Sequence, residues 1–135
     1  MNTIAKLRYT SALAGFALAI SSPGIAGAAN FAGSWAFSGT LGNPVLATSA
    51  PICVFRQNGS AIAGSCKGPY GIGSANGSVN GSAIYFQWHV IATRAGGLSG
   101  IATYHGSWGG DGVVRGTWWH STYPGIVGNF TGQKV

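Results

Sequence analysis

Acidic side chains are almost missing from this sequence. Asp111 is the single carboxylate residue in 135 residues, and there is no glutamate. Catalysis by paired carboxylates is therefore excluded. A Ser-His-Asp triad would need Asp111 as a buried group that orients the histidine, but Asp111 lies in a glycine-rich stretch typical of an exposed hairpin turn. We expect that the protein is not an enzyme.

Groups that could hold a metal ion or a phosphate are also scarce. The three histidines, His89, His105 and His120, lack the close spacing of a zinc site. The predicted strand faces place the first two outside and His120 at the inner end of its strand. The Gly-Ile-Gly stretch at 71–73 lacks the third glycine and the helix of a phosphate-binding motif. The sequence therefore predicts no metal and no cofactor.

Basic side chains are few as well. Residues 29–135 hold five of them and one acid, which gives a net charge of +4 with neutral histidine: Arg56, Lys67, Arg94, Arg115 and Lys134. They are widely spaced along the chain, whereas nucleic-acid binding requires cations clustered on one face. We expect no nucleic-acid partner. Weak attraction to an anionic envelope surface remains open.

Only one long apolar run is present, and it lies near the N-terminus. Two basic residues precede the run at 11–20, and small residues at 26–28 follow it. This order is typical of a cleavable signal peptide, and the run is too short to span a membrane. The alternative to a signal peptide is that this N-terminal run forms a buried helix of the folded domain. We predict a signal peptide over 1–28, a single domain over 29–135, and a periplasmic or secreted location.

The two cysteines, Cys53 and Cys66, are expected to form a disulfide bond if the chain is exported. If Gly59-Ser60 form a two-residue turn, counting outward along both strands places the cysteines opposite each other. They then occupy a non-hydrogen-bonded pair, where Cα atoms approach to about 4.5 Å. A turn at Asn58-Gly59 would put them two positions out of register.

Aromatic, β-branched and glycine residues dominate the rest of the chain and predict an all-β fold. The segment Asn-Gly-Ser-Ala-Ile at 58–62 recurs at 80–84, and both copies are typical of hairpin turns. Eight strands are expected, at 31–38, 52–57, 60–66, 72–79, 83–91, 98–108, 113–121 and 126–133. They favour an eight-stranded antiparallel up-and-down β-barrel, with a two-sheet sandwich as the alternative. An outer-membrane barrel is a further alternative, but several strands are shorter than the roughly 9–11 residues of a membrane-spanning strand and the inward face is apolar, so we expect no membrane insertion.

Large rings alternate with polar residues along these strands. A glycine often lies two positions before the ring, as in Gly33-Ser34-Trp35, which allows the sharp bending of a small barrel. A three-residue turn at 110–112 would place Tyr104 opposite Trp118. Five rings are then candidate ligand-lining residues on the inward face: Trp35, Trp88, Tyr104, Trp108 and Trp118. These rings either pack a core or line a cavity. Tyr85, Trp119 and Tyr123 are expected outside.

These features resemble the avidin–streptavidin family. The similarity is clearest at Ala32-Gly33-Ser34-Trp35, Gly77-Ser78-Val79-Asn80-Gly81 and Gly116-Thr117-Trp118. The resemblance implies a barrel with an internal ligand site, in which Trp118 and Trp88 are similar in position to rings that pack on biotin. The polar biotin contacts are mostly replaced, because Phe37 stands where the family has an asparagine and Asn129 lies near the place of its aspartate.

Two further resemblances bear on function. Exported bacterial metalloprotease inhibitors are barrels with one disulfide, but only Ala29 and Asn30 precede the expected first strand, which leaves no inhibitory arm. The chain also looks like other small secreted proteobacterial proteins, which implies no function. We expect an exported, non-enzymatic barrel that binds a small apolar or aromatic ligand. The alternative is a protein-interaction module, a secreted protease inhibitor or an envelope-associated structural protein, which uses the outer face and the 39–51 loop.

Overall fold

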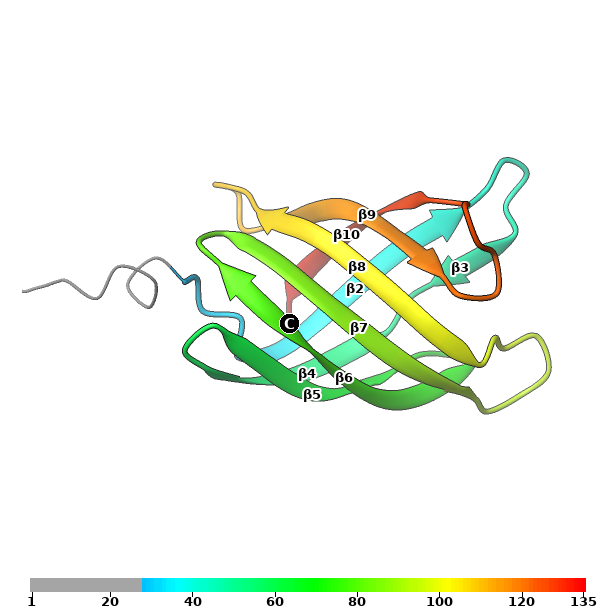
Figure 1. Cartoon of the computed structure of the whole chain (residues 1–135), viewed down its shortest axis with the longest axis horizontal. Helices are drawn as coiled ribbons and strands as arrows, with labels where there is room; N and C mark the ends of the chain where they lie inside the picture. The colour runs from blue at the N-terminus through cyan, green and yellow to red at the C-terminus, as the bar shows by residue number, and fades with distance from the viewer. Residues whose placement is uncertain (1–27) are drawn as a thin grey trace, which may run out of the picture.

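The computed structural model describes residues 28–135, which form strands and connecting turns (Figure 1). The strands are β2 (Gly33–Leu41), β3 (Ala47–Ser49), β4 (Ile52–Asn58), β5 (Ala61–Lys67), β6 (Gly71–Asn80), β7 (Ala83–Ala92), β8 (Gly100–Trp108), β9 (Val114–His120) and β10 (Gly128–Lys134). The predicted signal peptide, except for Ala28, lies outside the described residues. Within them, no helix is long and apolar enough to cross a membrane.

Eight of the strands form a closed antiparallel barrel in up-and-down order. From β4 to β10 each strand pairs with the next, β2 pairs with β4, and β10 pairs back with β2. Closure gives every one of these strands a partner on both sides and leaves no long open edge. The expected eight-stranded barrel is confirmed, as is the register that places Tyr104 opposite Trp118.

The short strand β3 corrects one expectation, because part of the 39–51 loop is strand. Gly39 pairs with Phe130 of β10 on one side and with Ser49 of β3 on the other. The backbone N–H of Phe37 donates to the carbonyl of Pro51 at 3.0 Å. Strand β3 therefore continues the line of β4 along β2. Ala-Thr-Ser at 47–49 has no large side chain, so the hydrophobic pattern carried no strand signal there.

Both copies of the repeated segment form two-residue hairpin turns. Gly59 and Gly81 have φ angles of 62° and 59°, a left-handed conformation that glycine adopts without steric cost. The first turn sets the register that places Cys53 opposite Cys66. Their side chains form a disulfide with the Cα atoms 4.0 Å apart, which confirms the pairing predicted from the Gly59-Ser60 turn.

Aromatic rings fill the middle of the barrel around Phe37. The centroid of its ring lies 5.1–6.4 Å from those of five others: Trp35, Phe55, Phe86, Tyr104 and Phe130. Glycines make room for rings that come from the next strand but one in the sheet. A Cβ atom on Gly106 would lie 2.8 Å from Cζ of Phe130, and one on Gly39 would lie 2.6 Å from Nε1 of Trp118. Glycine and large rings are thus complementary parts of one core.

The two ends of the barrel differ. At one end, Phe31 from the N-terminal segment is fully buried, and its ring centroid lies 5.1 Å from those of both Trp35 and Trp108. Nε1 of Trp35 donates to the carbonyl of Phe31 at 3.0 Å. We call this the closed end. The other, open end carries four connections (Figure 1): residues 42–46, 68–70, 93–99 and 121–127.

Candidate functional site

A cavity of about 470 Å³ lies at the open end of the barrel. Its floor is formed by inward-facing side chains of β7, β8 and β9: Trp88, Val90, Ala102, Trp118 and His120. Its rim comes from the connections, with Leu46, Tyr70, Leu98 and Tyr123 among the lining residues. The volume lies within the range of small-molecule sites, about 300–1,000 Å³. Strands therefore fix the floor, and irregular segments form the rim.

The floor of the cavity is also the top of the aromatic core. Trp118 stacks on Tyr104 with ring centroids 5.7 Å apart, and Tyr104 stacks on Phe86 at 4.5 Å. Trp88 lies opposite Ala102 on the neighbouring strand, and both tryptophans are at most 5% exposed. A molecule in the cavity would meet side chains that the core already holds in place. Such a preorganised floor reduces the entropic cost of binding.

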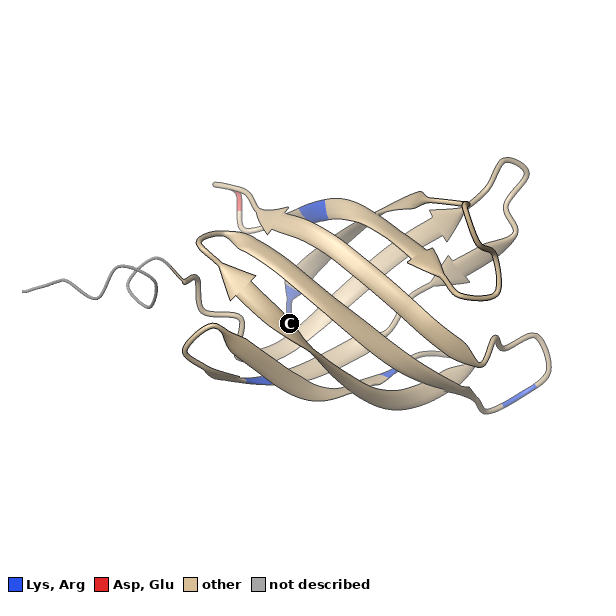
Figure 2. Cartoon of the chain, in the orientation of Figure 1, with Lys and Arg blue, Asp and Glu red and all other residues tan. Residues whose placement is uncertain are grey.

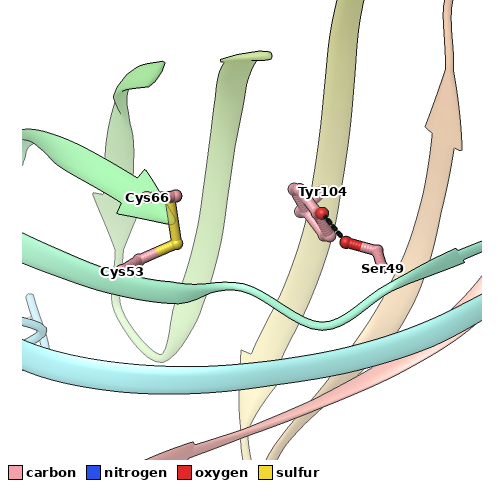
Figure 3. The surroundings of a disulfide bond; sticks show 4 residues. All are labelled: Ser49, Cys53, Cys66 and Tyr104. Carbon is pink, nitrogen blue, oxygen red and sulfur yellow. Dashed lines mark hydrogen bonds between the residues drawn. A yellow bond between two sulfur atoms is a disulfide. The ribbon is translucent and has the colours of Figure 1, made fainter. Parts of the chain in front are cut away.

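The floor of the cavity includes a hydroxyl group bonded to the core. The Ser49 hydroxyl, which lines the cavity, forms a hydrogen bond with the phenol of Tyr104 (Figure 3). Burial raises the pKa of Tyr104 far above its usual value, and the bond to Ser49 offsets this only partly. Tyr104 therefore stays a neutral phenol. The Cys53–Cys66 disulfide lies just downstream of Ser49 and fixes the start of β4 to β5.

His120 is the only titratable side chain on this floor, and the rim engages both of its ring nitrogens. Nδ1 accepts a hydrogen bond from the backbone N–H of Thr122 at 3.0 Å, so Nε2 carries the proton and donates to the carbonyl of Leu98 at 3.2 Å. Burial lowers the pKa of His120, and the bond to Leu98 opposes that shift. The neutral ring thus ties the connection at 93–99 to the one at 121–127.

The indole N–H groups of the floor have no hydrogen-bond partner. Nε1 of Trp88 and Nε1 of Trp118 are both buried. They face glycines of other strands, since Cβ atoms built on Gly73 and Gly39 would lie 3.5 Å and 2.6 Å from them. The surface that the two tryptophans present to the cavity therefore consists of ring carbon atoms. Apart from Ser49 and the engaged His120, the floor is apolar.

The structure separates the five predicted ligand-lining residues into two groups. Trp88 and Trp118 line the cavity, and Tyr104 lies beneath it. Trp35 and Trp108 lie at the closed end with Phe31. Alternation along a strand predicts which face a residue occupies, but not which end of the barrel. The pattern of the sequence did not predict the rim, where large side chains lie among small ones: Val45, Leu46, Tyr70, Leu98 and Tyr123.

Tyr123 was expected on the outer surface, and this was wrong. Its side chain is half-buried against the core and lines the cavity. It lies in the irregular connection after β9, where no alternation of faces applies. The turn there brings it back over the barrel, since its backbone N–H donates to the carbonyl of His120 at 3.0 Å.

Asp111, Arg115 and the other two histidines lie away from the cavity. Asp111 is in the turn between β8 and β9, where the hydrogen bond from Arg115 is the main cause that lowers its pKa to about 2. His89 and His105 are exposed on the outer wall, as expected. Within residues 28–135, no three histidine, cysteine or acidic side chains come together as metal ligands would.

The resemblance to the avidin–streptavidin family implies a ligand that packs on Trp88 and Trp118 inside the barrel. Phe37, which stands where that family has an asparagine, fills the centre of the barrel in this structure. The open space lies instead above the core, at the open end. The resemblance itself stays a prediction. Comparisons of the chain with models of known families, with curated proteins and with solved structures find no match.

Proposed function

We propose that this chain is an exported, non-enzymatic barrel that binds a small apolar or aromatic molecule in the cavity at its open end. The observation that carries the proposal is the asymmetry of the barrel. The closed end is filled by Phe31, Trp35 and Trp108, whereas the open end leaves about 470 Å³ above the rings of Trp88 and Trp118. A large cavity with aromatic walls is the default position for a ligand.

The chemistry of the cavity supports an apolar occupant. Its floor presents ring carbon atoms and aliphatic groups, with the indole N–H groups turned toward Gly73 and Gly39. Transfer of apolar surface from water contributes about 25 cal/mol per Å². The Ser49 hydroxyl is the one side chain of the floor able to accept or donate a further hydrogen bond without breaking a rim contact.

Fluorescence titration with the neutral aromatic amine N-phenyl-1-naphthylamine tests the proposal. We expect a saturable change in tryptophan emission and a higher melting temperature, because a ligand specific to the folded state stabilises it by mass action. Ala102→Leu should abolish the signal, since Ala102 is buried and faces the cavity from β8. Trp108→Phe, at the closed end, is the matched control and should leave the affinity unchanged.

Two outcomes would contradict ligand binding in this cavity. One is the absence of saturable binding by the probe and by a broad panel of small apolar and aromatic molecules. The other is binding of equal strength to the wild type and to folded Ala102→Leu, which would place the probe elsewhere. A melting temperature for each variant shows whether it is folded and keeps these outcomes separate from simple unfolding.

Export is the second part of the proposal. A small barrel with a disulfide bond is consistent with an oxidising compartment. The mature chain is expected to begin at Ala29 or Asn30, as measured by intact mass on protein from the cell envelope or medium. Ala29 is already fixed to the barrel, because its N–H donates to the carbonyl of Gly81 at 2.8 Å. Protein from that fraction with Met1 still present would contradict cleavage of the segment.

One observation favours the alternative, a protein-interaction module. Ile52, Ile72 and Ile91 lie in one row across the outer wall, with Lys67 between the first two, and they are 45%, 45% and 65% exposed. An exposed apolar row can be part of a protein interface. In that case Ile72→Glu would weaken binding of a partner and Ala102→Leu would not. Ligand binding in the cavity predicts the reverse pattern for the naphthylamine probe.

A further inference from the structure

The single acidic side chain lies near one end of the barrel, whereas basic side chains lie toward both ends (Figure 2). Asp111 and Arg115 form an ion pair at the closed end with an N–O distance of 2.8 Å. Lys134 lies at the same end, with its Nζ 5.8 Å from the ring centroid of Trp35. At the open end, Lys67 ends β5 and Arg94 follows β7. The open end therefore carries two cations, and the single acidic side chain lies at the opposite end.

Arg94 is held at the rim of the cavity. Its guanidinium carbon lies 5.6 Å from the centroid of the Tyr70 ring, and Tyr70 lines the cavity. The backbone supports this position, because the N–H of Thr93 donates to the carbonyl of Tyr70 at 2.9 Å. The N–H of Gly97 donates to the carbonyl of Arg94 at 3.1 Å. The connection that bears Arg94 is thus fixed to the connection that bears Tyr70.

The guanidinium of Arg94 has no acidic partner among residues 28–135, because the single acidic side chain, Asp111, is paired with Arg115 at the closed end. An exposed arginine beside an aromatic ring keeps its donors available for an anion. Lys67, on the outer wall next to Gly68, adds a second positive charge at the open end. The field at the opening therefore favours an anionic group over a neutral or cationic one.

We propose that the cavity is selective for anionic amphiphiles, small molecules with one carboxylate- or sulfonate-type group on an apolar or aromatic body. The inference rests on the proposed function and names the class of ligand. The body packs on Trp88 and Trp118, and the anionic group stays at the rim near Arg94. This arrangement keeps the charge in contact with water and avoids burying it in the apolar floor.

Two probes of similar shape and different charge test the selectivity. They are 8-anilinonaphthalene-1-sulfonate, which is anionic, and N-phenyl-1-naphthylamine, which is neutral. We expect Arg94→Gln to weaken sulfonate binding about threefold at low salt, the scale of one partly exposed ion pair, and to leave amine binding unchanged. Arg94→Lys should recover part of the loss. Added salt should reduce the effect, because it screens exposed charges.

Controls separate this inference from the proposed function. Arg56→Gln, on the outer wall of β4, should change neither affinity. Ala102→Leu should remove the signal of both probes, so sulfonate fluorescence that persists in this variant would come from the outer surface and overturn the selectivity. Failure of both probes and of the broad panel to bind the wild type contradicts the proposed function. If the amine binds but Arg94→Gln affects both probes equally or neither, only the anionic class is overturned.

Discussion

Ser49 and Tyr104, which are 55 residues apart in the chain, form a buried hydrogen bond between the floor of the cavity and the aromatic core. Ser49 ends β3, the strand that continues β4 after a short break, and Tyr104 lies in the middle of β8. Tyr104 in turn stacks on Phe86 and Trp118. The cavity and the core are thus one structure, and a residue such as Trp118 belongs to both.

Removal of the Ser49 hydroxyl should destabilise the barrel. In Ser49→Ala the phenol of Tyr104 is left buried without a partner, which costs about 1–3 kcal/mol in the free energy of unfolding. The double variant Ser49→Ala/Tyr104→Phe removes both polar groups and should recover part of that loss. Urea denaturation of the wild type, the two single variants and the double variant measures the coupling. A loss in the double variant equal to the sum of the losses in the two single variants would show that the bond does not stabilise the fold.

The disulfide should contribute measurably to stability. Reduction of Cys53–Cys66, which closes a loop with a sequence separation of 13 residues, should lower the free energy of unfolding by about 3 kcal/mol in the chain-entropy model. Denaturation with and without dithiothreitol measures the loss. The control is Cys53→Ala/Cys66→Ala, which should not respond to the reductant. Peptide mapping without reduction should show the bond within one chain, and free thiols there would refute the prediction.

The sequence predicted the barrel because its signals are local. Alternation along β7, the glycine turns at Gly59 and Gly81, and the turn at 110–112 each determine which residues face each other across a hairpin. Tight turns join β4 to β5, β6 to β7 and β8 to β9, so local registers determine three pairings of the sheet, and the connections at 68–70, 93–99 and 121–127 join these hairpins and β10 in sequence order. The position of the cysteines followed from the same counting.

The cavity was less predictable, because it depends on relations between distant segments. Trp35 and Trp108 show the same inward pattern as Trp88 and Trp118. The position of each ring along the barrel axis, however, follows from the pairing of β10 with β2 that closes the barrel. Phe31 fills the closed end from a segment without regular structure. The rim consists of connections, where side chains such as Tyr123 turn inward without any period in the sequence. Pattern reasoning therefore identified the rings and not the opening.

Stability should depend on pH through His120. Its pKa in the folded state is lower than the ordinary value of 6.5, mainly because of burial, so the unfolded chain binds its proton more readily. Stability is therefore complete above about pH 6.5 and falls as the pH drops from there through the folded pKa. The physical reason is that a proton on Nδ1 of His120 removes the acceptor of the hydrogen bond from the backbone N–H of Thr122.

Melting temperatures of the wild type and of His120→Gln between pH 8 and 5 test this dependence. The difference between the two proteins isolates His120 from the exposed His89 and His105, which both proteins share. We expect the advantage of the wild type to shrink as the pH falls. A difference that stays constant or grows toward pH 5 would mean that the ring is not held neutral in the folded barrel.

Phe31→Ala should separate the two ends of the barrel. The ring of Phe31 is fully buried between Trp35 and Trp108, so its loss leaves a void in the closed end that costs about 3–5 kcal/mol. The cavity at the open end does not include this residue, and the affinity for N-phenyl-1-naphthylamine should stay within a factor of about two at temperatures where the variant is folded.

Asn30→Ala is the matched control for Phe31→Ala. Asn30 is exposed, and its Oδ1 accepts one local hydrogen bond from the N–H of Ala32, so its replacement should change the melting temperature only slightly. Two results would contradict the division into two ends. An unchanged melting temperature in Phe31→Ala would mean that the N-terminal segment does not complete the core. The second is a loss of probe binding as complete as in Ala102→Leu, which would mean that the cavity depends on the closed end. In that case the loss of contacts between Phe31 and Trp35 would change the position of Trp118 through the aromatic core.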